Sequence, residues 1–379
     1  MYISKLTLVN YKNFKNTSLR FHKGVNTIIG ENGSGKSNIL RAIRLLLDDN
    51  MVRSAYRLEE GDFSRSLDQW QGHWIIISME FDEITTDESV QALFLHGTAP
   101  LDDGPIHKAT YNLIFRPKKD IRLKLAALEL FDFKELSEIR DAITIDDYET
   151  LFTGRSSADF GNPAVYRSIV GDFDICDFSS ETEFPEIGAK VPGFLSVTKE
   201  VSLTFIQALR DVVSEFHNNR TNPLLTLLKS KSGDINPLTM EPISEMVRGL
   251  NASIEGLEDV QSVRNHIRET IKDAAGETYS PASLSIKSDL PEEADKLFQS
   301  LRLFVGESEE GYEGAIHELS LGGANLIYLT LKLLEFKYQR EKLAMANFLL
   351  IEEPEAHIHT HIQKTLFDRI AYSDVNRHG

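Results

Sequence analysis

Apolar and polar residues alternate along several short stretches of the chain, and this alternation predicts β-strands. The first such stretch runs from Ile3 to Val9 and has the pattern of a half-buried strand. The same reasoning predicts further strands at residues 24–29, 74–81, 111–115 and 201–207. The pattern between residues 120 and 196 is weak and mixed, so no element is assigned there.

Helical spacing of apolar residues first occurs directly after Ser37, where five leucines and isoleucines between residues 39 and 47 fall on one side of a helix. A polar, helix-like stretch follows at 208–277 and is broken by turn signals at 231–234 and at Asn236-Pro237. Strand-like residues at 283–287 and 301–304 are expected to return to the core. A helix is predicted at 325–342, and a short buried strand at 348–351.

This order of elements predicts an α/β fold in which a mostly helical insertion separates two parts of one domain. We expect residues 1–207 to form the N-terminal part of the main domain. Residues 208–280 would form the inserted arm, and residues 281–379 the C-terminal part.

The composition is that of a folded, soluble protein, with 41% hydrophobic and 26% charged residues among 379. No apolar run approaches the roughly 20 residues that a membrane-spanning helix needs, and the N-terminus lacks the pattern of a secretion signal. Cys176 is the single cysteine, so no intrachain disulfide can form. We therefore expect a cytoplasmic protein that does not contact membranes.

The formal net charge of −17 argues against a uniformly basic surface for nucleic acid. Any contact with nucleic acid would have to come from local basic patches. Two candidate patches are Arg116, Lys118, Lys119, Arg122 and Lys124, and Lys229 and Lys231 with Arg220. Ordinary solvated faces with acidic neighbours are the favoured interpretation of both.

The stretch Gly30-x-x-x-x-Gly35-Lys36-Ser37 fits the P-loop pattern at every fixed position, between a predicted strand and a predicted helix. In such a loop, backbone N–H groups turn towards the phosphates, the lysine reaches the β and γ phosphates, and the serine hydroxyl binds magnesium. We therefore predict that the chain binds ATP and Mg²⁺. The residues expected to hold the nucleotide here are Gly30, Glu31, Asn32, Gly33, Ser34, Gly35, Lys36, Ser37 and Asn38.

Two further sites are weaker candidates for the nucleotide pocket. Lys12 and Asn13, after the first strand, could approach the adenine or ribose, although a solvated turn is the commoner role. Gln207 at the end of a strand, with Arg210 after it, could line the site.

Glu352 and Glu353 follow the apolar run Phe348 to Ile351, as two carboxylates at the end of a buried strand would. Because successive strand side chains point to opposite faces, the two acids are expected to have different roles. Glu352 would support magnesium beside Ser37, directly or through water, and Glu353 would orient or deprotonate the attacking water. The catalytic residues predicted are therefore Glu353 and Lys36.

About 30 residues earlier, Ser320, Gly322 and Gly323 open a predicted helix. Backbone donors and the positive end of the helix dipole could bind a phosphate there. Taken alone, the pattern is hardly more specific than an ordinary helix N-cap.

Together, IIGENGSGKSNILRAI, the Ser-x-Gly-Gly helix start and LLIEEPEAHIH resemble the ABC-type ATPases of the RecF and SMC group. Within that group, EEPEAHIHTHIQ and FIQALRDVVSEF are most similar to the overcoming-lysogenization-defect (OLD) family, which includes the nuclease subunit of Gabija antiphage systems. The resemblance covers both ends of the chain. In the middle it rests only on the order strand, arm, strand.

The resemblance implies an ABC-type P-loop fold with a mixed sheet, working as a homodimer or higher oligomer. The segment from Ser320 to Gly323 of one subunit would close over ATP held at Lys36 of another, and the insertion after Arg210 would be a dimerisation arm. Family members usually continue into a Toprim nuclease domain. Because this chain ends at Gly379, we expect either a truncated chain or a relative whose effector is a separate protein.

The function implied is that of the ATPase part of a DNA nuclease, regulating DNA cleavage in antiphage defence. A stand-alone ATPase sensor that controls a separate defence effector is an alternative, and so is an SMC-like or RecF-like DNA-repair ATPase. The acidic charge and the lack of a long heptad repeat make the repair ATPase the least favoured.

Two other motifs are judged less important. Asp172, Asp174 and Asp177 could belong to an acidic metal cluster, but an acidic loop is preferred. His357, His359 and His361 alternate and could bind a metal, but the resemblance places them in a segment that contacts the neighbouring subunit.

Overall fold

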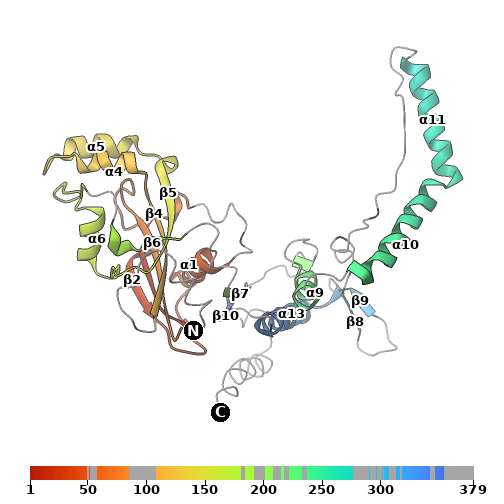
Figure 1. Ribbon diagram of the computed structural model, residues 1–379, viewed down its shortest axis with the longest axis horizontal. Helices are drawn as coiled ribbons and strands as arrows, with labels where there is room; N and C mark the ends of the chain where they lie inside the picture. The colour runs from red at the N-terminus through yellow and green to blue at the C-terminus, as the bar shows by residue number, and fades with distance from the viewer. Residues whose placement is uncertain are drawn as a thin grey trace. The chain divides into compact units, whose positions relative to one another are not determined.

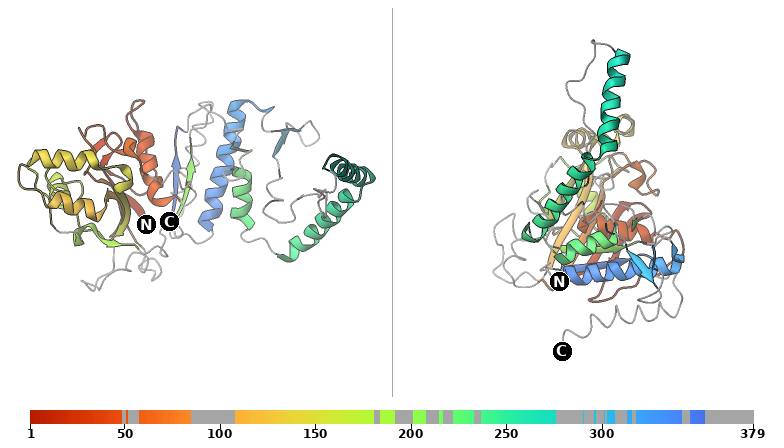
Figure 2. Two further views of the ribbon diagram at one scale, coloured as in Figure 1. Left: turned by 90° about the horizontal axis from the view of Figure 1, so that it is seen from above. Right: turned by 90° about the vertical axis from the view of Figure 1, so that its right-hand side faces the viewer.

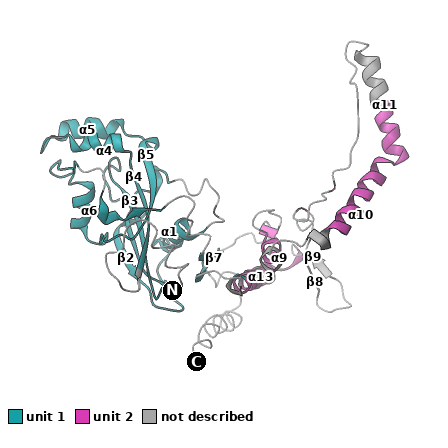
Figure 3. Ribbon diagram, viewed as in Figure 1, with its two compact units in different colours: residues 1–208, 339–379 teal, residues 209–338 magenta. Residues whose placement is uncertain are grey.

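A computed structural model describes residues 1–48, 51, 58–84, 108–180, 184–191, 201–207, 215–216, 222–232, 237–275, 290, 296, 301, 303–306, 313–315, 318–341 and 346–353. The chain divides into two compact units (Figure 3). Unit 1 comprises residues 1–208 and 339–379, and unit 2 comprises residues 209–338. The three-part division into domains made above stays a prediction.

Unit 1 is built on a six-stranded sheet whose order is β2-β1-β3-β4-β5-β6 (Figure 1). Every pair of neighbouring strands in it is antiparallel. Its strands are β1 (Tyr2–Tyr11), β2 (Phe14–Arg20), β3 (Ile75–Asp82), β4 (Lys108–Pro117), β5 (Tyr148–Gly154) and β6 (Ala189–Lys190). The strands predicted near residues 3–9, 74–81 and 111–115 are therefore confirmed.

Each face of this sheet is covered by its own set of apolar side chains, because neighbouring strand residues point to opposite faces. On one face, Leu6 and Ile77 share a core with the buried side of α1 (Lys36–Leu47), the helix predicted after Ser37. On the other face, Val9 and Ile76 pack with α6 (Pro163–Val170). The sheet thus carries α1, and with it the P-loop, on one of its two buried faces.

The connections of the sheet add short helices that the sequence pattern did not predict. They are α4 (Lys119–Ala126), α5 (Phe133–Ala142) and the 3-10 turns η1 (Glu60–Asp62), η2 (Ile145–Asp147) and η3 (Pro185–Ile187). All of them lie between strands of the main sheet or next to them in the chain.

A second, parallel sheet in unit 1 consists of β7 (Val201–Ile206) and β10 (Ala346–Ile351), which lie side by side in Figures 1 and 2. Leu203 and Leu350 belong to the same apolar core as α1. The guanidinium of Arg44 on α1 lies 4.0 Å from the ring centroid of Phe205. The α/β class is as expected, with the antiparallel and parallel pairings divided between two sheets.

Unit 2 is mostly helical, as predicted for residues 208–277 and 325–342. It contains α9 (Pro223–Ser232), α10 (Pro237–Glu255), α11 (Glu258–Ala275), most of α13 (Leu321–Glu341), and a small antiparallel pair, β8 (Phe304–Gly306) with β9 (Glu313–Ala315). Among the described helices of the whole chain, none is long and apolar enough to cross a membrane.

Two strand predictions were wrong. Residues 24–29 form no strand, and Val25 and Ile29 are 57% and 89% exposed. The strand that follows β1 is instead β2, which pairs with β1 across a tight turn that the sequence analysis missed. Residues 301–304 do not rejoin the main sheet, because β8 begins at Phe304 and pairs with β9 in unit 2. The strand predicted at 283–287 lies outside the described residues.

Candidate nucleotide-binding site

The glycine loop of residues 30–35 leads directly into α1, which begins at Lys36. Gly33 and Gly35 have φ angles of 82° and 102°, in the left-handed region that favours glycine. A side chain at Gly35 would also collide with the amide of Asn13. The backbone path of the loop therefore requires glycine at position 35.

The N-terminus of α1 is suited to bind an anion. It has no side-chain cap and no acidic residue in its first turn. The first backbone N–H groups of a helix lack partners within the helix, and the helix dipole places partial positive charge there. A phosphate would satisfy both, so the local structure fits the nucleotide predicted from the sequence.

The ammonium of Lys36 lies across the loop. Its Nζ donates to the carbonyl oxygens of Gly30 at 2.6 Å and of Glu31 at 2.9 Å. This places the positive charge over the backbone path that would surround a phosphate. Ser37 is exposed in the first turn of α1, and Asn32 is exposed in the loop turn.

Asn13 links the β1–β2 turn to the loop. Its Nδ2 donates to the carbonyl of Ser34 at 2.8 Å, and its Oδ1 accepts from the Nδ2 of Asn38 at 2.9 Å. Asn13 therefore contacts the P-loop and the first turn of α1 at the same time. In this arrangement Asn13 holds the loop in place. A direct contact between Asn13 and the nucleotide stays a prediction.

A buried carboxylate beside this turn was missed by the sequence analysis. Asp62 is 3% exposed and forms ion pairs with Lys12 at 2.8 Å and with Arg41 of α1 at 2.5 Å. Burial by itself opposes its charge, but the hydrogen bonds from Lys12 and Arg41 outweigh this and lower the pKa of Asp62. Asp62 thus joins the β1–β2 turn to α1. Its partners lie far from it in sequence, so no local pattern could have indicated this role.

Glu352 and Glu353 follow β10, as predicted. The Glu352 N–H donates to the carbonyl of Ile206 at 2.8 Å, which extends the parallel ladder by one residue and brings Gln207 to the same edge. Glu352 is half-buried, and Glu353 is exposed with a left-handed φ of 45°. Strained backbone of this kind in a non-glycine residue often marks a functional position.

Within the part of the chain that the structure describes, no hydrogen bond or ion pair joins Glu352 or Glu353 to the glycine loop and first helical turn at residues 30–38. Magnesium prefers oxygen ligands, and the Ser37 hydroxyl and the Glu352 carboxylate supply that donor type. Both belong to unit 1, and both have accessible side chains. These residues therefore fit the ion chemically.

Ser320 caps α13 in unit 2, since its Oγ accepts from the N–H of Gly323 at 3.2 Å. Gly322 lies in the first turn of the same helix. The ordinary N-cap role that the sequence allowed is thus present here, and a phosphate contact by this segment stays a prediction.

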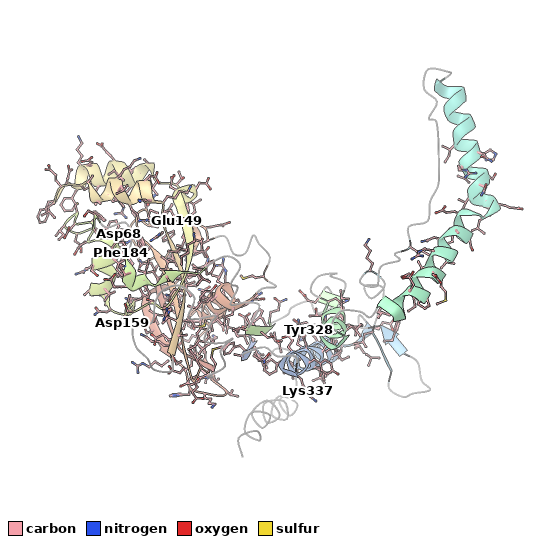
Figure 4. All side chains as sticks on the ribbon, in the orientation of Figure 1. Asp68, Glu149, Asp159, Phe184, Tyr328 and Lys337 are labelled. Atoms are coloured by element: carbon pink, nitrogen blue, oxygen red, sulfur yellow. The ribbon has the colours of Figure 1, made fainter. Side chains whose placement is uncertain are left out.

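Two of the five cations of the first basic patch, both arginines, are paired with an acidic residue. Arg116 and Arg122 both donate to the carboxylate of Glu149, which is labelled in Figure 4, at 2.9 and 3.0 Å. The side chains of the two arginines are only 12% and 11% exposed. For these two arginines, this supports the interpretation as a solvated face with an acidic neighbour. Side-chain detail of Lys229, Lys231, Arg210 and Arg220, and all of His357, His359 and His361, lie outside the described residues.

The acidic residues Asp172 and Asp177 close a loop through two backbone hydrogen bonds of 2.7 and 3.0 Å. Within the described part of the chain, no three His, Cys, Asp or Glu side chains are grouped as a metal site would require.

A glycine loop ending at a helix N-terminus, with a lysine folded across it, defines a P-loop nucleotide-binding protein. The family model for the AAA ATPase domain matches residues 1–372, so the chain belongs to this family of ATPase domains.

Short segments of the chain are also similar to RecF and SMC proteins. A DNA replication and repair protein RecF of Geobacillus thermodenitrificans is 48% identical over 46 residues, which are 12% of this chain and 12% of that protein. A structural maintenance of chromosomes protein 3 homolog of Plasmodium falciparum is 45% identical over 62 residues, 16% of this chain and 5% of that protein. The chain thus aligns with a small part of these relatives.

Among solved structures, RecF with ATP aligns over 97% of this chain and 89% of that one, with 12% identity and a TM-score of 0.38. These matches are to the AAA ATPase domain family and to short segments of RecF and SMC proteins, and none of them supports the specific OLD assignment.

Proposed function

We propose that this chain binds ATP with magnesium at residues 30–38 and hydrolyses it to ADP and phosphate. The observation that carries the proposal is the uncapped N-terminus of α1 behind a loop that only glycine can form. Lys36 would stabilise negative charge that develops on the transferred phosphoryl group. Magnesium, held by Ser37 and supported by Glu352, would neutralise charge on the phosphate oxygens.

In the proposed reaction Glu353 orients the attacking water and accepts its proton as the oxygen bonds to the γ-phosphorus and the bond to the β-phosphate oxygen breaks. The exposed position of Glu353 at the end of β10 leaves its carboxylate free to reach a water molecule. The segment from Ser320 to Gly323 would complete the site from a second subunit, making the active form at least a homodimer.

Replacing Glu353 by Gln tests the chemistry. We expect Glu353→Gln to bind ATP as the wild type does and to lose turnover by at least about a hundredfold, since a general base contributes about that much. Lys36→Ala should lose nucleotide affinity itself. Binding is measured by titration with a fluorescent ATP analogue, and turnover by phosphate release. Wild-type turnover in Glu353→Gln would contradict the role given to that residue.

At the finer level we propose that this ATPase regulates DNA cleavage by an OLD-type nuclease in antiphage defence. The support is the similarity of the segments 205–216 and 352–363 to that family. Cleavage would need a nuclease domain or a partner protein. The test is to add DNA and magnesium to this chain together with a candidate nuclease and to ask whether the Lys36→Ala variant abolishes ATP control of cleavage.

A DNA-repair ATPase is the second candidate function, favoured by the short segments that are 45–48% identical to RecF and SMC proteins. It predicts that this chain alone binds duplex DNA when ATP is present. A gel-shift titration with and without ATP separates the two candidates, because the nuclease-regulating function does not require DNA binding by this chain.

A further inference from the structure

Two loops of unit 1 meet at its surface, far from the P-loop in sequence. The first joins α4 to α5 and includes residues 127–132, and the second, residues 171–178, follows α6 (Figure 1). The N–H of Phe131 donates to the carbonyl of Ile175 at 2.9 Å, which fixes the two loops side by side.

These loops expose large apolar side chains. Leu130 and Phe131 are 61% and 62% exposed, and Phe133 and Ile175 are 52% and 36% exposed. The rings of Phe131 and Phe133 are neighbours, with centroids 6.4 Å apart. We call these four residues the apolar knuckle. Contiguous exposed apolar side chains rimmed by polar residues are characteristic of interaction sites.

The backbone holds the knuckle in a conformation that these residues rarely adopt. Phe131 has a φ of 65° and Cys176 a φ of 58°. A bulky side chain in the left-handed region is strained, so such a residue persists only where its surroundings fix it. Here the Asp132 side chain caps α5 by accepting from the Glu135 N–H at 3.0 Å, and the Phe133 N–H donates to the carbonyl of Phe131 at 3.0 Å.

The second loop, residues 171–178, is held in place by aromatic packing of its own Phe173. The Phe173 ring stacks on His73 with centroids 3.9 Å apart and meets Phe178 edge-on at 4.9 Å. The knuckle is therefore presented on a fixed base. A fixed base reduces the entropy that a binding partner must overcome on docking.

The polar residues around the knuckle are nearly all acidic. The two loops and the first turn of α5 carry Glu129, Asp132, Glu135, Asp172, Asp174 and Asp177, against one lysine, Lys134, and Asp172 also pairs with Arg167 of α6 at 3.8 Å. Negative charge at this density repels nucleic acid and anionic lipid headgroups. It also disfavours a second copy of this chain, which carries a net charge of −17. The charge is complementary to a basic protein segment.

We propose that the apolar knuckle docks an amphipathic, Lys/Arg-rich segment of a partner protein. The apolar side of that segment would cover Phe131 and Phe133, and its basic residues would face the surrounding carboxylates. This surface is separate from the nucleotide-binding loop, so the proposal does not depend on the proposed ATP chemistry.

The test uses the full chain and two synthetic fluorescent peptides of about 16 residues, long enough for about four helical turns. One has leucines on one face and lysines and arginines on the other, and the second has glutamates in place of the basic residues. Binding is measured by fluorescence anisotropy at physiological ionic strength, where charges beyond about 8 Å are screened. We expect the basic peptide to bind at least tenfold more tightly than the acidic one.

Substitutions locate the binding. The double variant Phe131→Ser with Phe133→Ser should lower the affinity for the basic peptide at least tenfold. The double variant Glu135→Gln with Asp174→Asn should lower this affinity severalfold. Val25→Ser removes a side chain of similar exposure, 57%, outside the knuckle, and should leave binding unchanged. Equal affinity of the double serine variant and the wild type would overturn the proposal.

A fourth variant, Phe131→Gly, separates binding from folding. Phe131→Gly relieves the strain of the left-handed backbone, so it should raise the unfolding temperature of the protein. Because it removes an apolar side chain of the knuckle, it should also lower the affinity for the basic peptide. Unchanged affinity in Phe131→Gly would also count against the proposal. If light scattering instead shows that the double serine variant loses an oligomer that the wild type forms, the knuckle contacts a second copy and the stated partner is wrong.

Discussion

Asp62 is a single buried residue that joins the turn beside the glycine loop to α1. Its carboxylate is buried and binds one cation from the β1–β2 turn and one from α1. That turn in turn holds the loop through Asn13. A residue that fixes the relative position of these elements should influence both stability and nucleotide affinity.

We predict that Asp62→Asn lowers the free energy of unfolding by about 3 kcal/mol, because it leaves Lys12 and Arg41 without their buried partner. We also expect a several-fold loss of ATP affinity, because the turn that holds the loop is released. Urea unfolding and nucleotide titration measure the two effects.

Asp48→Asn is the matched control. Asp48 is also buried, and it binds Arg44 at 2.8 Å near the opposite end of α1. The Asp48→Asn variant should have a lower free energy of unfolding and the same ATP affinity as the wild type. An equal loss of affinity in the two variants would mean that Asp62 acts only through general stability.

At the scale of elements, sequence patterns located strands and helices that contribute several apolar side chains to the core. β1, β3, β4 and α1 are of this kind, since burial selects the apolar positions. The pattern failed at residues 24–29, where the apolar side chains of Val25 and Ile29 are exposed. Strand formation needs a hydrogen-bonding partner strand as well as a suitable pattern, and the neighbour of β1 is β2.

The packing of α6 against the sheet makes stability depend on pH through His73. Burial, and next the charges of Arg140 and Lys15, lower the pKa of His73 to about 3. In the unfolded chain it is about 6.5. Between these values the unfolded state binds a proton that the native state does not, so stability falls as pH falls from about 6.5 towards 3.

We predict that acidification from pH 7 to pH 5 costs the wild type about 2 kcal/mol more unfolding free energy than it costs a His73→Phe variant. Phenylalanine keeps an aromatic ring against Phe173 and removes the titration. Urea unfolding of unit 1, followed by the fluorescence of Trp70 and Trp74, measures the difference. Parallel pH profiles for the two proteins would show that His73 does not carry the effect.

At the scale of the whole molecule, the inserted helices are the candidate for assembly. Met246 on α10, Leu257 in the connection between α10 and α11, and Val263 on α11 are 67%, 55% and 50% exposed. We predict that the chain forms an oligomer without nucleotide, and that ATP acts as a conformational signal within it. Size-exclusion chromatography with light scattering, with and without ATP and magnesium, measures this in the wild type and in Glu353→Gln.

A monomer that associates only with ATP would contradict this prediction and would favour the repair-type ATPase, in which nucleotide joins the subunits. The double variant Met246→Ser with Leu257→Ser should reduce assembly. The double variant Phe131→Ser with Phe133→Ser leaves α10, α11 and their connection unchanged and serves as the comparison.

The sequence by itself indicated the glycine loop before α1, the pair of acids after β10, and those elements that have a clear apolar pattern, such as β1, β3 and α1. Each of these depends on residues that are close together in the chain, so local spacing is sufficient. The tertiary structure decided that β2 is the neighbour of β1, that Asp62 binds Lys12 and Arg41, and that Phe131 and Phe133 are exposed. These features arise from contacts between distant residues and from which surfaces remain uncovered, and neither is encoded in a local pattern.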